Sequence, residues 1–161
     1  MKIHNNRIAH RGAFNNIDIP ENSLLAFKKA IKMNWAIELD VQLTKDNVLV
    51  VFHDENLERM TGINKNICEV TSMEIKEFSL LDTKEKIPTF EEVLNLVRGK
   101  VLIDIEVKNT RRIHETCQIL LSILKHYPYS YILKSFNPKI VRYLKKHTNS
   151  EVGYLIHSKY R

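Results

Sequence analysis

Residues 36–41 read AIELDV, and this stretch decides how the surrounding sequence is interpreted. Successive side chains of a β-strand point to opposite faces. Glu38 and Asp40 would therefore leave one face of such a strand, and the apolar residues around them would leave the other. The same alternation returns in residues 102–108, LIDIEVK, whose charged side chains are Asp104, Glu106 and Lys108. The sequence thus predicts two strands that are each apolar on one face and charged on the other.

Strand and helix patterns alternate on both sides of these two stretches. Extended apolar runs predict strands at 8–9, 35–43, 48–52, 101–107, 131–135 and 152–156. Apolar residues at helical spacing predict helices over 24–31 and 111–126 and from 138 onward. Such alternation, without a repeat or a linker, is typical of a βα series around a parallel sheet or barrel. We therefore predict an α/β fold in a single domain that covers residues 1–161.

Short polar motifs mark where several of these elements begin. Thr71 with Glu74 and Thr89 with Glu92 have the spacing of capping boxes, so a short helix is expected after each threonine. Candidate caps for two further helices are Asn22 or Ser23, and Asn137 followed by Pro138. Residues 44–47, TKDN, suit a tight turn that would pair the two flanking strands as a hairpin.

The charged faces leave two interpretations open. One is a half-exposed antiparallel sheet whose polar face meets water. The other places both strands centrally in a helix-covered sheet, so that four carboxylates converge, and burying unpaired negative charge is costly. A hard divalent cation held by carboxylate oxygens would relieve that repulsion, and Lys108 or Arg11 could neutralise part of it or bind a substrate anion. The flanking helices favour the second interpretation.

Two histidines follow predicted strands beside this acidic cluster. His10 ends the first strand and His53 ends the run over 48–52. Each alone is typical of a surface or structural histidine. Together they indicate a general acid and base pair, because imidazole titrates near neutral pH. Cys68 and Cys117 have neither metal-ligand spacing nor an evident base, so both are interpreted as structural.

Composition narrows the class of protein. The chain has 161 residues and a formal net charge of +6, spread over positions that the helix patterns place in solvent, so no nucleic-acid partner is predicted. No apolar run approaches the roughly 20 residues of a membrane span, and residues 1–10 do not resemble a secretory signal. With only two cysteines, a disulfide framework is not expected. We therefore expect a cytoplasmic location.

Taken in chain order, the motifs resemble those of the glycerophosphodiester phosphodiesterases, a family of metal-dependent TIM barrels. The matching pieces are His10-Arg11-Gly12, Pro20-Glu21-Asn22, Ile37-Glu38-Leu39-Asp40-Val41, Thr44-Lys45-Asp46, His53-Asp54, Leu57, Arg59, Thr61, Pro88-Thr89 with Glu92 and Leu94, Ile105-Glu106-Val107-Lys108, and Ser135-Phe136. Any one tripeptide is weakly specific, but the ordered set spans most of the chain.

The resemblance implies hydrolysis of a glycerophosphodiester, such as glycerophosphocholine or glycerophosphoethanolamine, to glycerol 3-phosphate and an alcohol. The implied ligands of a Ca²⁺ or Mg²⁺ ion are Glu38, Asp40 and Glu106. The implied acid-base pair is His10 and His53, and the implied phosphate-binding residues are Arg11 and Lys108. Which histidine is the acid is not fixed. In barrels of this type the site lies at the carboxyl ends of the strands.

The sequence departs from the family pattern at a few positions. Asn34 and Asn47 stand where glycine is usual, and asparagine tolerates the left-handed backbone. Ser23 replaces threonine and keeps a hydroxyl. The chain contains about five βα units, whereas a complete (β/α)₈ barrel takes about 200 residues or more. We therefore expect a barrel truncated after about five units, whose exposed edges a homo-oligomer could cover.

Two alternative functions remain open at this point. A catalytically impaired remnant could serve only for binding or assembly, since the missing units would supply walls of the substrate site. A related barrel phospholipase, acting on phosphoinositides, sphingomyelin or lysophospholipids, would use similar acid-base chemistry. The Pro20-Glu21-Asn22 and Ile105-Glu106-Val107-Lys108 motifs favour the glycerophosphodiesterases.

Overall fold

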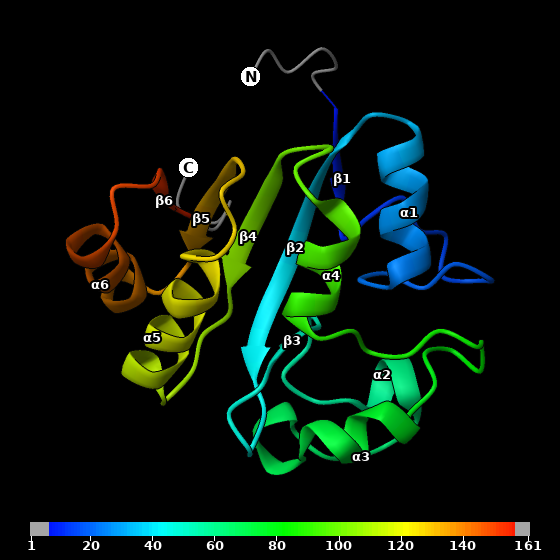
Figure 1. Cartoon of the computed structure of the whole chain (residues 1–161). Helices are drawn as coiled ribbons and strands as arrows, with labels where there is room; N and C mark the ends of the chain where they lie inside the picture. Colours follow the sequence, from blue (N-terminus) through cyan, green and yellow to red (C-terminus); the bar gives the residue numbers. More distant parts are fainter. Residues whose placement is uncertain (1–6, 157–161) are drawn as a thin grey trace.

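The computed structural model describes residues 7–156, and the ends of the predicted domain, residues 1–6 and 157–161, lie outside the described part (Figure 1). The elements, in chain order, are β1 (Ile8–His10), α1 (Leu24–Lys32), β2 (Ala36–Leu43), β3 (Leu49–Val51), α2 (Glu58–Thr61), the 3₁₀-helix η1 (Ile67–Glu69), α3 (Ser72–Glu77), α4 (Phe90–Val97), β4 (Ile103–Val107), α5 (Ile113–Leu124), β5 (Tyr131–Ser135), α6 (Pro138–His147) and β6 (Val152–Tyr154).

One sheet organises these elements. Its strands follow the order β1-β2-β4-β5-β6 and all neighbours on this path are parallel, while β3 pairs antiparallel with β2. The predicted α/β fold and the predicted hairpin over 35–52 are therefore confirmed. The alternative of a half-exposed antiparallel sheet is wrong, because each parallel connection carries a crossover that places helices against the sheet.

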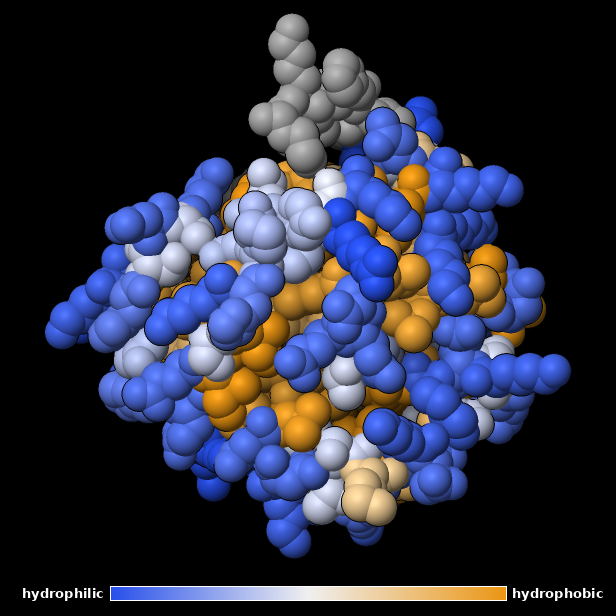
Figure 2. Space-filling model, viewed as in Figure 1, coloured by the Kyte–Doolittle hydropathy of each residue, from blue (hydrophilic) through white to orange (hydrophobic). Residues whose placement is uncertain are grey.

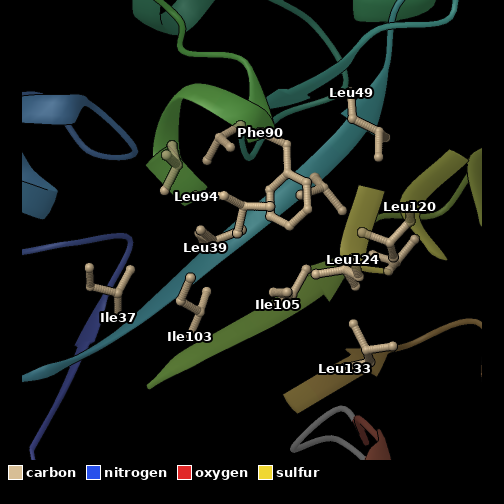
Figure 3. Packing of buried hydrophobic residues seen from close by; sticks show 14 of the residues in the cluster. Ile37, Leu39, Leu49, Phe90, Leu94, Ile103, Ile105, Leu120, Leu124 and Leu133 are labelled. Atoms are coloured by element: carbon tan, nitrogen blue, oxygen red, sulfur yellow. The ribbon is translucent and has the colours of Figure 1, made fainter. Parts of the chain in front are cut away.

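The helices cover the apolar face of the sheet. Figure 1 shows α4 in front of β2, with α5 beside β4 and β5. The main core lies between these layers and includes Ile37 and Ile103. Figure 3 shows Leu39 of β2 near Phe90 and Leu94 of α4, and Ile105 of β4 near Leu124 of α5. On the face seen in Figure 2, hydrophilic residues surround and partly cover a central area of hydrophobic residues. The odd-numbered residues of both strands thus form the core that their alternation predicts.

A second, smaller core lies in the segment between β3 and α4. It contains buried residues of β3, α2, η1 and α3, among them Val50, Leu57, Met60, Ile67 and Ile75. Figure 1 places α2 and α3 beyond the carboxyl end of β2. This segment therefore forms a wall at the end of the sheet where the site is predicted. Neither α2 nor η1 was expected from the sequence, since both are too short to show a periodic pattern.

The predicted caps and backbone signals have mixed outcomes. Both capping boxes form, with Thr71 at the start of α3 and Thr89 at the start of α4. Ser23 rather than Asn22 caps α1, its hydroxyl accepting from the Ala26 amide. Asn34 and Asn47 both have positive φ, as their replacement of glycine predicts. Gly12 also has positive φ, and in addition an added Cβ would lie 2.8 Å from the Ala26 Cβ of α1.

Both cysteines are free thiols. Cys117 lies in the main core, where burial raises the pKa of its thiol to about 11, and Cys68 is exposed. Among the helices of the described residues, none is long and apolar enough to cross a membrane.

Candidate active site

Three carboxylates meet on the face of the sheet opposite the helices. Glu38 and Asp40 leave β2 and Glu106 leaves β4, and the parallel register places Asp40 beside Glu106. One carboxylate oxygen of each residue lies within 4.8 Å of the other two. The three residues are only 3%, 1% and 7% exposed, respectively. Period-two alternation on two adjacent parallel strands is what concentrates this buried negative charge.

Lys108 neutralises the two carboxylates nearer the carboxyl ends of the strands, Asp40 and Glu106. It follows β4, and its ammonium lies 2.7 Å from the Glu106 Oε1 atom and 3.4 Å from the Asp40 Oδ1 atom. The predicted phosphate-binding lysine is thus within the acidic cluster, at the carboxyl end of its strand.

Lys134 neutralises the two carboxylates nearer the amino ends of the strands, Glu38 and Asp104. It is not identified as a site residue from the sequence alone. It leaves β5, and its ammonium lies 2.9 Å from the Asp104 Oδ2 atom and 3.3 Å from the Glu38 Oε1 atom. Burial opposes its charge, but the hydrogen bond to Asp104 and the charges of both carboxylates raise the pKa of Lys134. The only signal in the sequence is a lysine inside an otherwise apolar strand.

Glu38 carries the clearest sign of crowding among these carboxylates. Burial, together with the negative charge of Asp40, raises the pKa of the Glu38 carboxyl despite the opposing effects of Lys134 and the Arg11 amide. A group whose ionised form is disfavoured in this way is stabilised by an added positive charge.

The donor set fits a hard divalent cation. Besides the three clustered carboxylates, the Asn22 amide carbonyl oxygen is buried and has no hydrogen-bond partner among the described residues. The Asp40 Oδ1 atom also accepts no hydrogen bond among these residues, although the Lys108 ammonium lies 3.4 Å away. Asn22 donates to the Asp40 Oδ2 atom at 3.0 Å. Buried carboxylate and amide oxygens are the ligands that Ca²⁺ and Mg²⁺ prefer. Asn22 was predicted only as a helix cap, although it lies in a family motif.

Arg11 lies beside the cluster and belongs to a second charge network. Its backbone amide donates to the Glu38 Oε2 atom at 3.0 Å, and its Nη1 atom donates to the Glu21 Oε1 atom at 3.0 Å. Its Nε atom lies 3.7 Å from the Asp40 Oδ2 atom. The residue has a left-handed backbone with φ of +56°. The predicted phosphate-binding arginine is therefore held at the rim of the acidic cluster by Glu21.

Glu21 is the buried centre of that network. Arg59 donates to both of its carboxylate oxygens and also pairs with Asp54. Burial alone would raise the pKa of the Glu21 carboxyl, but hydrogen bonds from Arg59 and Asn16 and the nearby guanidinium charges lower it to about 2. Glu21 thus connects the loop before α1 with the segment after β3.

The two predicted catalytic histidines lie at the edges of these networks. His10 ends β1, its side chain is 67% exposed, and its Nε2 atom lies 3.9 Å from the Glu38 Oε2 atom. His53 follows β3, and its Nδ1 atom lies 2.7 Å from the Asp54 Oδ1 atom. A carboxylate at Nδ1 fixes the imidazole orientation and leaves Nε2 available. Asp54 in turn pairs with Arg59, so both histidines contact the charged framework of the site.

A cavity of about 470 Å³ has Lys108 in its wall. Lys108 also contacts Glu106 and Asp40, but the clustered carboxylates themselves do not line this cavity. The other walls come from the ends of β2 and β4 and from the segment after β3. Residues with polar side chains on these walls include Gln42, Glu55, Glu69, Asn109 and Arg111.

Comparison with known proteins gives consistent family matches. The profile of the glycerophosphoryl diester phosphodiesterase family matches residues 10–161. A glycerophosphodiester phosphodiesterase of Caldanaerobacter subterraneus is 39% identical over 150 residues, which are 86% of this chain and 61% of that protein. A human protein named lysophospholipase D is 34% identical over 128 residues, covering 70% of this chain and 40% of its own length.

Solved structures show the same fold. A glycerophosphodiester phosphodiesterase from Thermotoga maritima superposes with a TM-score of 0.79 at 34% identity, covering 97% of this chain and 64% of that chain. A phosphodiesterase from Oleispira antarctica, solved with the product sn-glycerol-3-phosphate, gives a TM-score of 0.84 at 26% identity over 91% of this chain and 64% of its own.

These likenesses confirm a fold of the TIM-barrel type. The chain spans between 40% and 64% of the length of these four relatives. The matched region includes the whole acidic cluster and the segments that carry both histidines. The chain therefore belongs to the glycerophosphoryl diester phosphodiesterase family.

Proposed function

We propose that this chain hydrolyses glycerophosphodiesters to glycerol 3-phosphate and an alcohol in a metal-dependent reaction. The observation that carries this proposal is the buried cluster of Glu38, Asp40 and Glu106, flanked by a histidine at each of two strand ends. A phosphodiester is an anion, so its cleavage needs positive charge at its oxygens and a proton donor and acceptor within reach. The site contains residues for each of these tasks.

Glu38, Asp40 and Glu106 would hold the cation, with Ca²⁺ or Mg²⁺ as candidates because all three donors are oxygens. When bound, such an ion neutralises charge on the phosphate oxygens. Asn22 holds Asp40 in place from the side through its amide hydrogen bond.

The protein's own residues would bind the phosphate and move the protons. Lys108 and Arg11 lie at the rim of the cluster and supply positive charge toward the diester. One of His10 and His53 would accept a proton from the attacking nucleophile, and the other would donate a proton to the leaving alkoxide. Asp54 orients His53 so that Nε2 is the atom that exchanges the proton.

The cavity beside Lys108 would receive the alcohol part of the substrate. Its volume of about 470 Å³ exceeds that of a small head group. Its walls carry both acidic and basic side chains, among them Glu55 and Arg111, so a polar alcohol fits it better than an acyl chain. The similarity to a protein named lysophospholipase D motivates a second candidate, a lysophospholipid substrate.

A direct assay tests this proposal. The chain is incubated with glycerophosphocholine, glycerophosphoethanolamine or a lysophospholipid, and release of glycerol 3-phosphate or free alcohol is measured. We expect turnover that a chelator abolishes and that His10→Ala reduces by at least about a hundredfold. Absence of metal-dependent turnover would contradict the enzymatic function and favour a binding or assembly role. Faster turnover of the lysophospholipid would favour the second candidate.

Calorimetry tests the cation site independently of turnover. Ca²⁺ and Mg²⁺ are titrated separately into the wild-type chain and into a variant with Glu38→Ala and Glu106→Ala. We expect the wild type to bind one divalent cation per chain. The variant should bind both Ca²⁺ and Mg²⁺ much more weakly than the wild type does. Equal affinities would show that the carboxylates of β2 and β4 are not the ligands.

We also propose that copies of the chain associate and that the protein is cytoplasmic. The edge strands β1 and β6 each pair with one neighbour among the described residues, and Ile8 and Tyr154 on them are exposed. Unpaired strand edges favour association. Light scattering should then give a mass above that of one chain, and a monomer would contradict association. The exposed free thiol of Cys68 agrees with a reducing compartment, which cell fractionation can test.

A further inference from the structure

Lys134 occupies an unusual position inside the acidic face of the sheet. In the strand register Lys134 of β5 lies beside Glu106 of β4. Its ammonium nevertheless contacts Asp104 and Glu38, which lie two residues closer to the amino ends of β4 and β2 than Glu106 and Asp40 do. The side chain is only 16% exposed. A lysine that extends away from the open end of the site is badly placed to meet a substrate there, unlike Lys108.

The arrangement divides four carboxylates between two lysines. Lys108 contacts Glu106 and Asp40, and Lys134 contacts Asp104 and Glu38. Four carboxylates therefore face two ammonium groups and the Arg11 guanidinium, which Glu21 shares, so the acidic groups outnumber the basic groups around them.

Both carboxylate oxygens of Glu38 are held by positively charged or donating groups. Its Oε1 atom lies 3.3 Å from the Lys134 ammonium, and its Oε2 atom accepts from the Arg11 amide at 3.0 Å. Without Lys134 the Oε1 atom would lose its only ion pair among the described residues. Lys134 is itself held by its shorter contact with Asp104.

We propose that Lys134 is a built-in counter-charge that stabilises the metal-free site and sets the affinity for the divalent cation below its maximum. Its ammonium reduces repulsion between the carboxylates when no cation is bound, and it repels a cation held by Glu38 when one is. Lys134 is thus a positioning residue that acts through Glu38. This inference rests on the proposed cation site but not on the proposed hydrolysis.

The test compares Lys134→Met with Lys134→Arg in the full chain. Mg²⁺ alone, and separately Ca²⁺ alone, is titrated by calorimetry, and thermal unfolding is followed with chelator and with saturating cation. We expect Lys134→Met to bind the cation about tenfold more tightly and to unfold at a lower temperature in chelator. The opposite signs of the two changes distinguish a counter-charge from a merely structural lysine. Lys134→Arg retains the charge and should keep the wild-type affinity more closely.

Lys139→Met is the matched control, since it removes the same charge from an exposed position on α6. It should change neither readout. If Lys134→Met is too unstable in chelator to titrate, Asp104→Asn serves instead and should bind the cation more weakly, because it leaves Lys134 less neutralised.

The outcomes separate the proposals. A wild-type chain that binds no divalent cation would overturn both the cation site and the role of Lys134. A wild-type chain that binds the cation, with a Lys134→Met variant that binds it equally or more weakly, would overturn only the role of Lys134. Absence of turnover with either substrate class leaves the calorimetric result decisive for Lys134.

Discussion

The two faces of β4 differ sharply in what they bury. Ile105 is fully buried in the main core beneath the helices, whereas Glu106, the next residue, is buried among carboxylates on the opposite face. The first face gains free energy by removing apolar surface from water. The second brings like charges together, which opposes folding. Adjacent residues on one strand thus serve stability and chemistry separately.

The largest expected effect on stability comes from the apolar face. Ile105→Ala removes three buried carbon atoms from a close-packed region and leaves a cavity, so we expect it to lower the free energy of unfolding by about 2–5 kcal/mol. Urea unfolding of both proteins in chelator measures the difference. A loss under about 1 kcal/mol would mean that the helix-covered face is not the main source of stability. Cation affinity of the folded variant should remain that of the wild type.

The second-largest expected effect on the free energy of unfolding comes from Glu21, whose buried charge is paired with two guanidinium groups. In Glu21 the folded-state pKa of about 2 lies below the usual 4.5, so the ionised carboxylate stabilises the fold. That contribution is fully present above about pH 4.5 and is lost as the pH falls toward about 2. Because Arg59 is partly exposed, we expect Glu21→Gln to lower the free energy of unfolding by about 2 kcal/mol at pH 7.

The pH dependence makes this prediction specific. The difference between wild type and Glu21→Gln should shrink when unfolding is measured at pH 3.5 instead of pH 7. At pH 3.5 the Glu21 carboxyl of the unfolded chain is mostly protonated while that of the folded chain is still ionised, so proton uptake favours unfolding of the wild type. A difference that stays constant across this range would show that the charge of Glu21 is not what stabilises its contacts. Buried charge is therefore not uniformly unfavourable here, because Glu21 meets two guanidinium groups whereas Glu106 meets other carboxylates and shares the single Lys108 ammonium with one of them.

A local effect of about 1 kcal/mol is expected at the start of α4. Thr89→Ala removes the hydroxyl that accepts from the Glu92 amide and so breaks one half of the capping box. Unfolding in urea should detect this loss without a change in cation affinity. Thr89→Ser keeps the hydroxyl and serves as the control. Equal losses in both variants would assign the effect to the threonine methyl group.

Sequence alone predicts the strands, the capped helices and the shared acidic face, because each depends on residues that are close along the chain. Alternation puts Glu38 and Asp40 on one face in any strand. The capping boxes are likewise local. The two-layer α/β arrangement then follows from alternating elements with one apolar side.

The contacts that complete the site depend on register and could not be read from the sequence. Lys134 reaches Asp104 only because β5 pairs with β4 in one particular register, across 30 positions of the chain. Glu21 and Arg59 are 38 positions apart and meet because the segment after β3 folds back over the strand ends. Period and propensity carry no information on such pairings. The lysine in an apolar strand was visible but has no local partner.

The smallest expected effect on stability comes from Glu106, the neighbour of Ile105, for which the largest effect is expected. Glu106→Gln weakens an ion pair with Lys108 but also relieves repulsion from Asp40 and Glu38, and its amide oxygen can still accept from the Lys108 ammonium. In chelator we expect the free energy of unfolding to change by less than about 1 kcal/mol in either direction.

Saturating Mg²⁺ or Ca²⁺ should separate Glu106→Gln from the wild type. A cation that binds only the folded state stabilises it in proportion to its affinity, so the wild type should gain stability and the variant should gain much less. Thermal unfolding with chelator and with each cation measures both quantities in one series. A large loss of stability in chelator would mean that Glu106 stabilises the fold as Ile105 does. Equal stabilisation by the cation in both proteins would remove Glu106 from the ligands. The contrast between the two faces of β4 holds only if neither result is found.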